Sequence, residues 1–137
     1  MKNRTLLREI IVKVLYQVYI LEKTKVKYDI DLLIKEQIEV ENEFVKESVY
    51  GVLKHQKEIS DMANKYLDNW TIDRLSKVDK AILSLGIYEL IYTDTPSIVC
   101  INETIELSKV YSDPEVSKMI NASMDKIYKN EDLNGKE

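Results

Sequence analysis

Cysteine, glycine, proline and histidine are all scarce in this chain. Its 137 residues include one Cys, three Gly, two Pro and one His. The single cysteine, Cys100, cannot form an internal disulfide, which favours a reducing compartment. Sheets joined by tight turns usually need more glycine and proline, so their scarcity favours helices.

Long apolar runs are missing as well. No segment approaches the roughly 20 apolar residues of a membrane span. The basic start followed by an apolar stretch resembles a signal peptide only faintly, because Glu9 and Lys13 interrupt the stretch and no small-residue cleavage site follows. With 45% hydrophobic and 32% charged residues, the composition is that of a globular protein. We expect one cytoplasmic domain, covering residues 1–137, with no membrane contact.

Net charge alone argues against a nucleic-acid partner, because it is −4. Its distribution, however, is uneven: residues 1–27 hold seven Lys/Arg and two Glu, a local +5, which leaves −9 for the other 110 residues. Because phosphate contacts are local, a basic end on an acidic body can still bind RNA.

Apolar residues at helical spacing predict an all-α fold. The expected helices cover residues 3–22, 29–38, 41–69, 78–93, 101–111 and 114–129, with a break at 70–73 and a frayed tail at 130–137. Helix starts are indicated by Asp29, by Ser76 with Asp79, and by Asp113 before Pro114. The first helix is apolar nearly all round, which predicts that it is either sandwiched in the fold or bound by a partner.

The residues that could support catalysis have simpler structural explanations. The sequence has no phosphate-binding glycine loop, zinc-ligand spacing or nucleophile elbow. We interpret His55 as an ordinary helix histidine and Cys100 as a packing residue. Glu103 and Glu106 could form an acid/base pair, but we favour carboxylates that complement a helix dipole. The expectation is a protein that is not an enzyme and needs no cofactor or metal.

The basic start is more informative. Arg4 and Arg8 lie one helical turn apart, and Tyr16 and Tyr19 follow off the main apolar stripe. Arginine beside aromatic rings suits single-stranded RNA, since guanidinium groups bind phosphate and rings stack on bases. The alternative is a solvated helix start with tyrosines packed in the core.

Four segments resemble the NusB transcription antitermination family. They are residues 74–90, which read RLSKVDKAILSLGIYEL; residues 101–109, INETIELSK; residues 119–125, MINASMD; and residues 8–17, REIIVKVLYQ. The resemblance implies two packed three-helix bundles forming one compact domain, here an N-terminal sub-bundle at about 3–69 and a C-terminal one at about 74–129. It also implies an adaptor that binds boxA-type RNA of ribosomal RNA leaders together with NusE, a small-subunit ribosomal protein, and acts on RNA polymerase.

The resemblance carries over specific residues. Those implied to bind RNA are Lys2, Arg4, Arg8, Tyr16, Gln17, Lys118 and Asn121. Tyr88 and Glu89 are implied to bind the protein partner. The chain departs from the family pattern in its thin basic start, in Ser84 at a usual arginine, and in the loss of the aromatic and the glycine from the third motif, which predicts a weaker RNA binder.

Two other functions remain open from the sequence. A protein-binding or self-associating scaffold, for example a homodimer that buries Arg4 and Arg8, would suit the acidic body. A NusB-like domain of a ribosomal RNA methyltransferase would need a cofactor-binding domain with a glycine-rich loop after a strand, and these 137 residues hold none.

Overall fold

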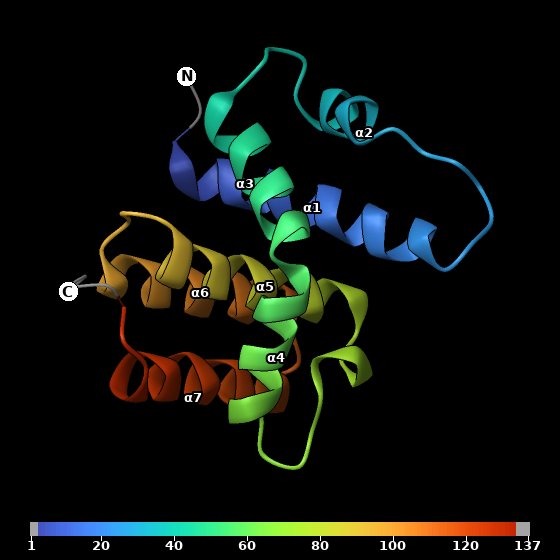
Figure 1. Ribbon diagram of the computed structural model, residues 1–137. Coiled ribbons are helices and arrows are strands. Elements are labelled where there is room, and N and C mark those ends of the chain that lie inside the picture. The colour runs from blue at the N-terminus through green and yellow to red at the C-terminus, as the bar shows by residue number, and fades with distance from the viewer. Residues whose placement is uncertain (1–2, 134–137) are drawn as a thin grey trace.

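The computed structural model describes residues 3–133 (Figure 1). The helices are α1 (Arg4–Glu22), α2 (Ile30–Gln37), α3 (Glu43–Lys54), α4 (Gln56–Tyr66), α5 (Lys77–Tyr92), α6 (Ser97–Tyr111) and α7 (Pro114–Asn130), with a short 3₁₀ turn, η1 (Ile72–Arg74), before α5. No strand occurs within residues 3–133, so the predicted all-α class is confirmed.

Side chains at the helix starts explain where several helices begin. Asn3 accepts a hydrogen bond from the Leu6 amide, and Asp29 accepts from the Asp31 amide. Ser76 Oγ accepts from the Asp79 amide at 3.1 Å and donates to the Asp79 carboxylate at 2.8 Å. Each bond satisfies a free amide that the helix itself cannot pair. The starts predicted for α2 and α5 are therefore confirmed.

Helix α5 lies at the centre of the molecule. It packs against α1, α3, α4, α6 and α7, and every residue from Ala81 to Ile87 is buried. A helix that is apolar on all sides is stable only when neighbours cover it completely. Helix α1 packs on α2, α3 and α5, so its apolar inner side is sandwiched as predicted, while Tyr16 and Ile20 stay exposed.

The predicted helix at 41–69 is wrong as a single element, because it breaks at His55. His55 has φ −102° and ψ 16°, outside the helical region, and its ring stacks on Tyr92 of α5. No glycine or proline marks this break. Helix α3 packs mainly on α1, whereas α4 packs on α5 and α7. The chain bends at His55 because the two helices pack on different neighbours. The division into sub-bundles at about 3–69 and 74–129 stays a prediction.

Helix α6 begins at Ser97, four residues earlier than predicted. Pro96 occupies the position before the helix, and its carbonyl accepts from the Val99 and Cys100 amides. Proline is well tolerated there, because it needs no amide partner. Glu103 and Glu106 therefore lie in later turns, and the prediction that they complement the start of the helix dipole is wrong. No helix within the described residues is both long and apolar enough to cross a membrane.

Candidate nucleic-acid interface

Arg8 and Glu89 form a buried, two-point ion pair between α1 and α5. Arg8 Nε donates to Glu89 Oε1 at 2.7 Å, and Nη2 donates to Oε2 at 2.9 Å. Both residues are almost fully buried, at 3% and 2% exposure. Arg8 Nη1 also donates to Glu103 on α6 at 3.2 Å. Although burial opposes its charge, the hydrogen bonds and charges of Glu89 and Glu103 raise the pKa of Arg8.

This ion pair corrects two of the residue assignments carried over by resemblance. In this conformation the Arg8 guanidinium is occupied by carboxylates and shielded from solvent, so it cannot contact an RNA phosphate. The Glu89 carboxylate is buried in the same pair and cannot reach a protein partner. Both residues join α1 to α5, which gives them a positioning role.

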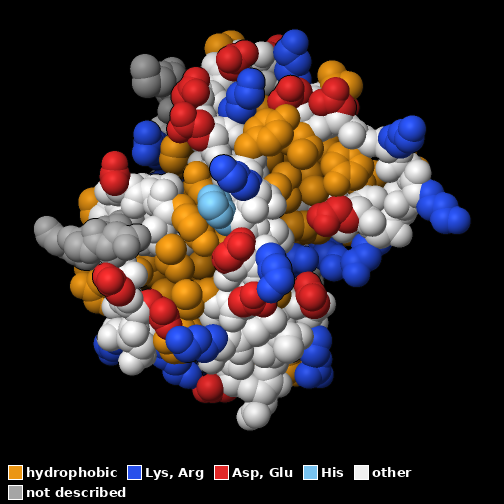
Figure 2. Space-filling model, in the orientation of Figure 1, with side chains coloured by type: hydrophobic (Ala, Val, Ile, Leu, Met, Phe, Trp, Pro, Cys, Tyr) orange, Lys and Arg blue, Asp and Glu red, His pale blue; other side chains and the backbone are white. Residues whose placement is uncertain are grey.

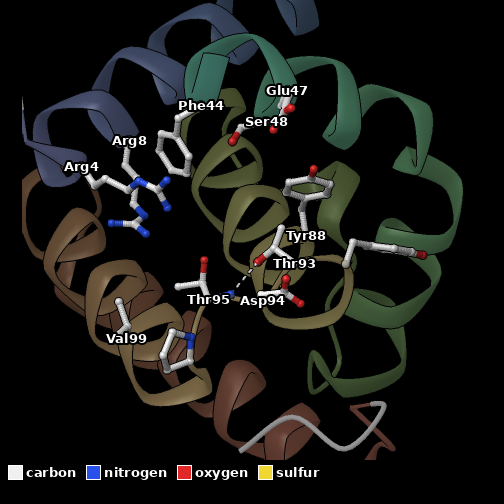
Figure 3. Close-up of a pocket in the computed structure, with 12 residues that line it drawn as sticks. Arg4, Arg8, Phe44, Glu47, Ser48, Tyr88, Thr93, Asp94, Thr95 and Val99 are labelled. Carbon is white, nitrogen blue, oxygen red and sulfur yellow. Dashed lines mark hydrogen bonds between the residues drawn. The ribbon is translucent and has the colours of Figure 1, made fainter. Parts of the chain in front are cut away.

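Arg4 stands at the edge of an open pocket beside this pair (Figure 3). The pocket has a volume of about 720 Å³ and lies between α1, α3 and the connection from α5 to α6. The Arg4 guanidinium lies over the Phe44 ring, 4.1 Å from its centroid. Within residues 3–133 no carboxylate pairs with Arg4, which is exposed, so its charge faces solvent and the pocket.

Tyr88 belongs to a short aromatic stack on the opposite wall. Its ring stacks with Tyr92 at 6.0 Å between centroids, and Tyr92 stacks with His55 at 4.0 Å. Burial and the nearby charges of Glu47 and Glu89 raise the pKa of Tyr88. His55, the pale-blue side chain of Figure 2, is bordered by hydrophobic side chains on this face. His55 thus has a packing partner, and its place in the stack could not be predicted from the sequence because it lies far from Tyr88 and Tyr92 in the chain.

Tyr16 and Gln17 lie elsewhere, on an apolar groove between α1 and α2. The groove is also lined by Ile20, Leu21 and Leu33, and has a volume of about 220 Å³. Figure 2 shows hydrophobic side chains gathered over the region where α1, α2 and α3 meet. Gln17 Oε1 is buried with no hydrogen-bond partner among the described residues. This groove offers apolar contact and one unpaired acceptor, as a protein-binding surface would.

Lys118 and Asn121 lie on α7, far from Arg4. Helix α7 starts beside the start of α5, because Ser112 donates to the Asp79 carboxylate just before α7 begins. Arg4 lies near the end of α5, and 16 residues of helix span about 24 Å. Lys118 is exposed, whereas Asn121 Oδ1 is buried and has no partner within the described chain. Lys2 lies outside the described residues.

A second group of lysines, which the sequence analysis did not identify, lies near the start of α5, where α7 also begins. Burial and the nearby charges of Lys23 and Lys80 lower the pKa of Lys77, and the nearby carboxylates of Asp73 and Glu22 oppose this shift. Lys80 Nζ pairs with Asp73 at 3.2 Å. The three lysines come from the end of α1 and the first turn of α5, and Lys80 Nζ lies 4.5 Å from the Tyr19 ring centroid. Lys23 and Lys77 are more than 50 positions apart, so only the antiparallel packing of α1 and α5 reveals the group.

Several features expected of a site are explained by packing. Cys100 is buried at 1% exposure, which confirms its packing role. Glu103 accepts from Arg8 and from Thr5, and Glu106 pairs with Lys109, so the two carboxylates do not act as a pair. Within residues 3–133 no group of His, Cys, Asp or Glu side chains is arranged to hold a metal ion.

Comparisons with known proteins point to one family. The NusB family profile matches residues 5–129. The NusB antitermination protein of Methylacidiphilum infernorum is 36% identical over 136 residues, covering 94% of this chain and 92% of that protein. The Listeria monocytogenes protein of the same name is 40% identical over 116 residues, covering 83% and 87%.

Solved structures agree over nearly the whole chain. NusB of T. maritima superposes with a TM-score of 0.80 at 30% identity, covering 94% of this chain and 92% of that one. A second similar chain comes from a crystal structure of antitermination factors NusB and NusE in complex with double-stranded RNA. Its TM-score is 0.79 at 27% identity, with coverage of 93% and 97%.

Proposed function

Because the chain belongs to the NusB family, we propose that it is a non-catalytic adaptor in transcription antitermination, which binds boxA-type RNA together with NusE. The observation that carries the proposal is similarity over nearly the full length to NusB proteins, one of them solved with NusE and RNA. As part of an RNA polymerase antitermination complex it would act in the cytoplasm. The basic side chains described above are suited to this role.

Two basic regions supply the phosphate contacts in this proposal. Arg4 provides the first, near the end of α5, and Lys118 with Lys23 and Lys77 provides the second, near its start, where Lys80 is already paired with Asp73. They are separated by about the length of α5, roughly 24 Å, which an RNA of several nucleotides can span. Arg8 contributes by holding α1, and therefore Arg4, against α5.

The protein partner is assigned to the groove between α1 and α2. Tyr16 and Ile20 are 40% and 41% exposed, on a helix whose other side is fully packed. Exposed apolar side chains around a buried, unpaired amide oxygen fit a partner that brings apolar contact and one hydrogen-bond donor. Glu89, buried under α1, does not fit that role.

Binding of fluorescent boxA-like RNA, measured by anisotropy, tests the proposal. A scrambled RNA serves as control, each RNA is tested single-stranded and double-stranded, and each titration is run with and without NusE at two salt concentrations. We expect preference for boxA, tighter binding with NusE, and a steep salt dependence. Arg4→Ala and Lys118→Ala should each lower the salt slope by about one unit.

Lys35 provides a control. It is an exposed lysine on α2, outside the pocket and both basic regions. Lys35→Ala should leave boxA binding unchanged. If boxA were not preferred over the scrambled RNA even with NusE present, the RNA role would be wrong, and NusE binding alone would indicate a protein-binding scaffold. Sedimentation of the same samples would show whether the chain forms a homodimer.

A further inference from the structure

The pocket beside Arg4 has a chemical asymmetry that the general RNA role does not explain. Arg4 stands on one side with its guanidinium free of carboxylates among the described residues, and the Tyr88 ring stands on the other (Figure 3). Glu47 and Asp94 place carboxylates on the lining between them. A cation, an aromatic face and hydrogen-bond acceptors thus surround one open volume of about 720 Å³, which lies within the size range of small-ligand sites.

The aromatic wall is held rigidly in place. Tyr88 is backed by Tyr92, which is in turn backed by His55. On α3, Gly51 leaves room for the Tyr88 ring, because a side-chain carbon built at Gly51 would overlap it. Tyr88 and Tyr92 both line the pocket, so a planar group that enters it meets aromatic rings already held in place. Stacking on fixed aromatic rings is a main source of affinity for unpaired bases.

The cationic wall is equally fixed. Phe44 is contacted by two guanidinium groups, Arg4 at 4.1 Å and Arg8 at 5.4 Å from the ring centroid. Arg8 is held by Glu89, so Phe44 and Arg4 rest on a buried ion pair. The floor is ordered too, since the Thr95 amide donates to Thr93 Oγ1 and Thr93 donates to the Glu89 carbonyl.

We propose that this pocket receives one unstacked nucleotide of the bound RNA, with its base against Tyr88 and its phosphate on Arg4. This inference rests on the proposed function and identifies where the RNA is read. Arg4 holds the phosphate at its side of the pocket, which leaves the base edge facing Asp94 and Glu47. Carboxylates accept hydrogen bonds from the exocyclic amino groups of cytosine, adenine or guanine, which uracil lacks.

A nucleotide fits these groups better than a peptide segment does. An acidic peptide side chain that pairs with Arg4 meets the same repulsion from Glu47 and Asp94 as a phosphate does, but it brings no ring for Tyr88 and no amino donor for these carboxylates. A nucleotide carries its negative charge at one end and neutral amino donors at the other. Its two ends therefore match the two walls of the pocket.

An abasic scan of boxA-like RNA, read by anisotropy on the full chain with NusE, tests the proposal. Each nucleotide in turn loses its base, and one position is expected to weaken binding by about 5- to 100-fold. Tyr92→Ala removes the support of Tyr88 and should weaken binding of the intact RNA by a comparable factor. For the RNA that is abasic at that position, the same substitution should cause little further loss of affinity. Asp94→Asn should reduce the preference for an amino-bearing base over uracil there.

Tyr128→Ala is the matched control, since Tyr128 is 44% exposed and Tyr92 37%, and Tyr128 lies on α7 outside the pocket. It should leave the scan unchanged. If boxA binds but no position is coupled to Tyr92, the pocket proposal is overturned while the proposed function stands. If Tyr92→Ala weakens NusE binding without affecting RNA, the pocket belongs to a protein and the proposal is overturned. Failure of boxA to bind at all removes both.

Discussion

Arg8 and Glu89 are 81 positions apart, yet their side chains meet at 2.7 and 2.9 Å in the interior between α1 and α5. A buried ion pair adds modest stability over an apolar pair, but removing one partner leaves an uncompensated buried charge. We therefore expect Arg8→Ala to lower the free energy of unfolding by about 3–5 kcal/mol. Urea denaturation followed by circular dichroism measures the change.

The double variant Arg8→Met with Glu89→Leu separates the charge from the packing. Without either charge, apolar side chains can fill the space, so this variant should recover most of the loss. Glu103→Gln is the control for the weaker bond, since Glu103 is 21% exposed at its side chain and pairs with Arg8 at 3.2 Å. A double variant as unstable as Arg8→Ala would show that the ion pair is not the source of the loss.

This ion pair also marks the limit of what the sequence could predict. The starts of α2 and α5 were predictable because Asp29 and Ser76 bond to amides two or three residues away. Arg8, one turn after Arg4, looks equally solvated in the sequence, because its partner lies on a distant helix. The break at His55 was missed for the same reason: packing imposes it, and no local residue signals it.

Gly86 allows α5 and α6 to approach closely. A side-chain carbon built at Gly86 would overlap Thr104 Oγ1 of α6 and come within 3.1 Å of Met124. Alanine favours helix over glycine by about 1 kcal/mol, but crowding in a packed core costs about 1–3 kcal/mol. We expect Gly86→Ala to lower the thermal midpoint, measured by calorimetry. Adding Thr104→Ala makes room and should restore much of it, whereas no rescue would argue that the close approach is not the cause.

The contact of Glu131 with Lys65 and Tyr66, just after α7, should weaken in acid. Hydrogen bonds from Lys65 and Tyr66 lower the pKa of Glu131 from its usual 4.5. A carboxylate with a depressed folded pKa stabilises the fold above its unfolded pKa, and that contribution is lost as pH falls through the folded pKa. Wild type should exceed Glu131→Gln in thermal midpoint at pH 7, and the gap should close below pH 4.5. Glu36→Gln, at an exposed site on α2, is the control for removing a carboxylate charge.

The groove between α1 and α2 should be needed for the partner and dispensable for folding. Ile20→Ser places a hydroxyl at its exposed edge, where a docked apolar surface would lose contact. We expect NusE affinity, measured by calorimetric titration, to fall by about 10-fold or more, the loss typical of an interface anchor. Binding of RNA by the chain alone should change little, since the substitution alters no charge and phosphate contacts dominate that affinity.

Val110→Ser is the matched control for this variant. Val110 is a 70% exposed aliphatic residue on α6, so the two substitutions should cost similar, small amounts of helix stability. If the two variants lost NusE affinity equally, the loss would be general and the groove would not be the docking surface. If only Ile20→Ser loses affinity while both variants keep the same thermal midpoint, the exposed apolar side of α1 serves to bind a partner. The fold itself does not bury these side chains.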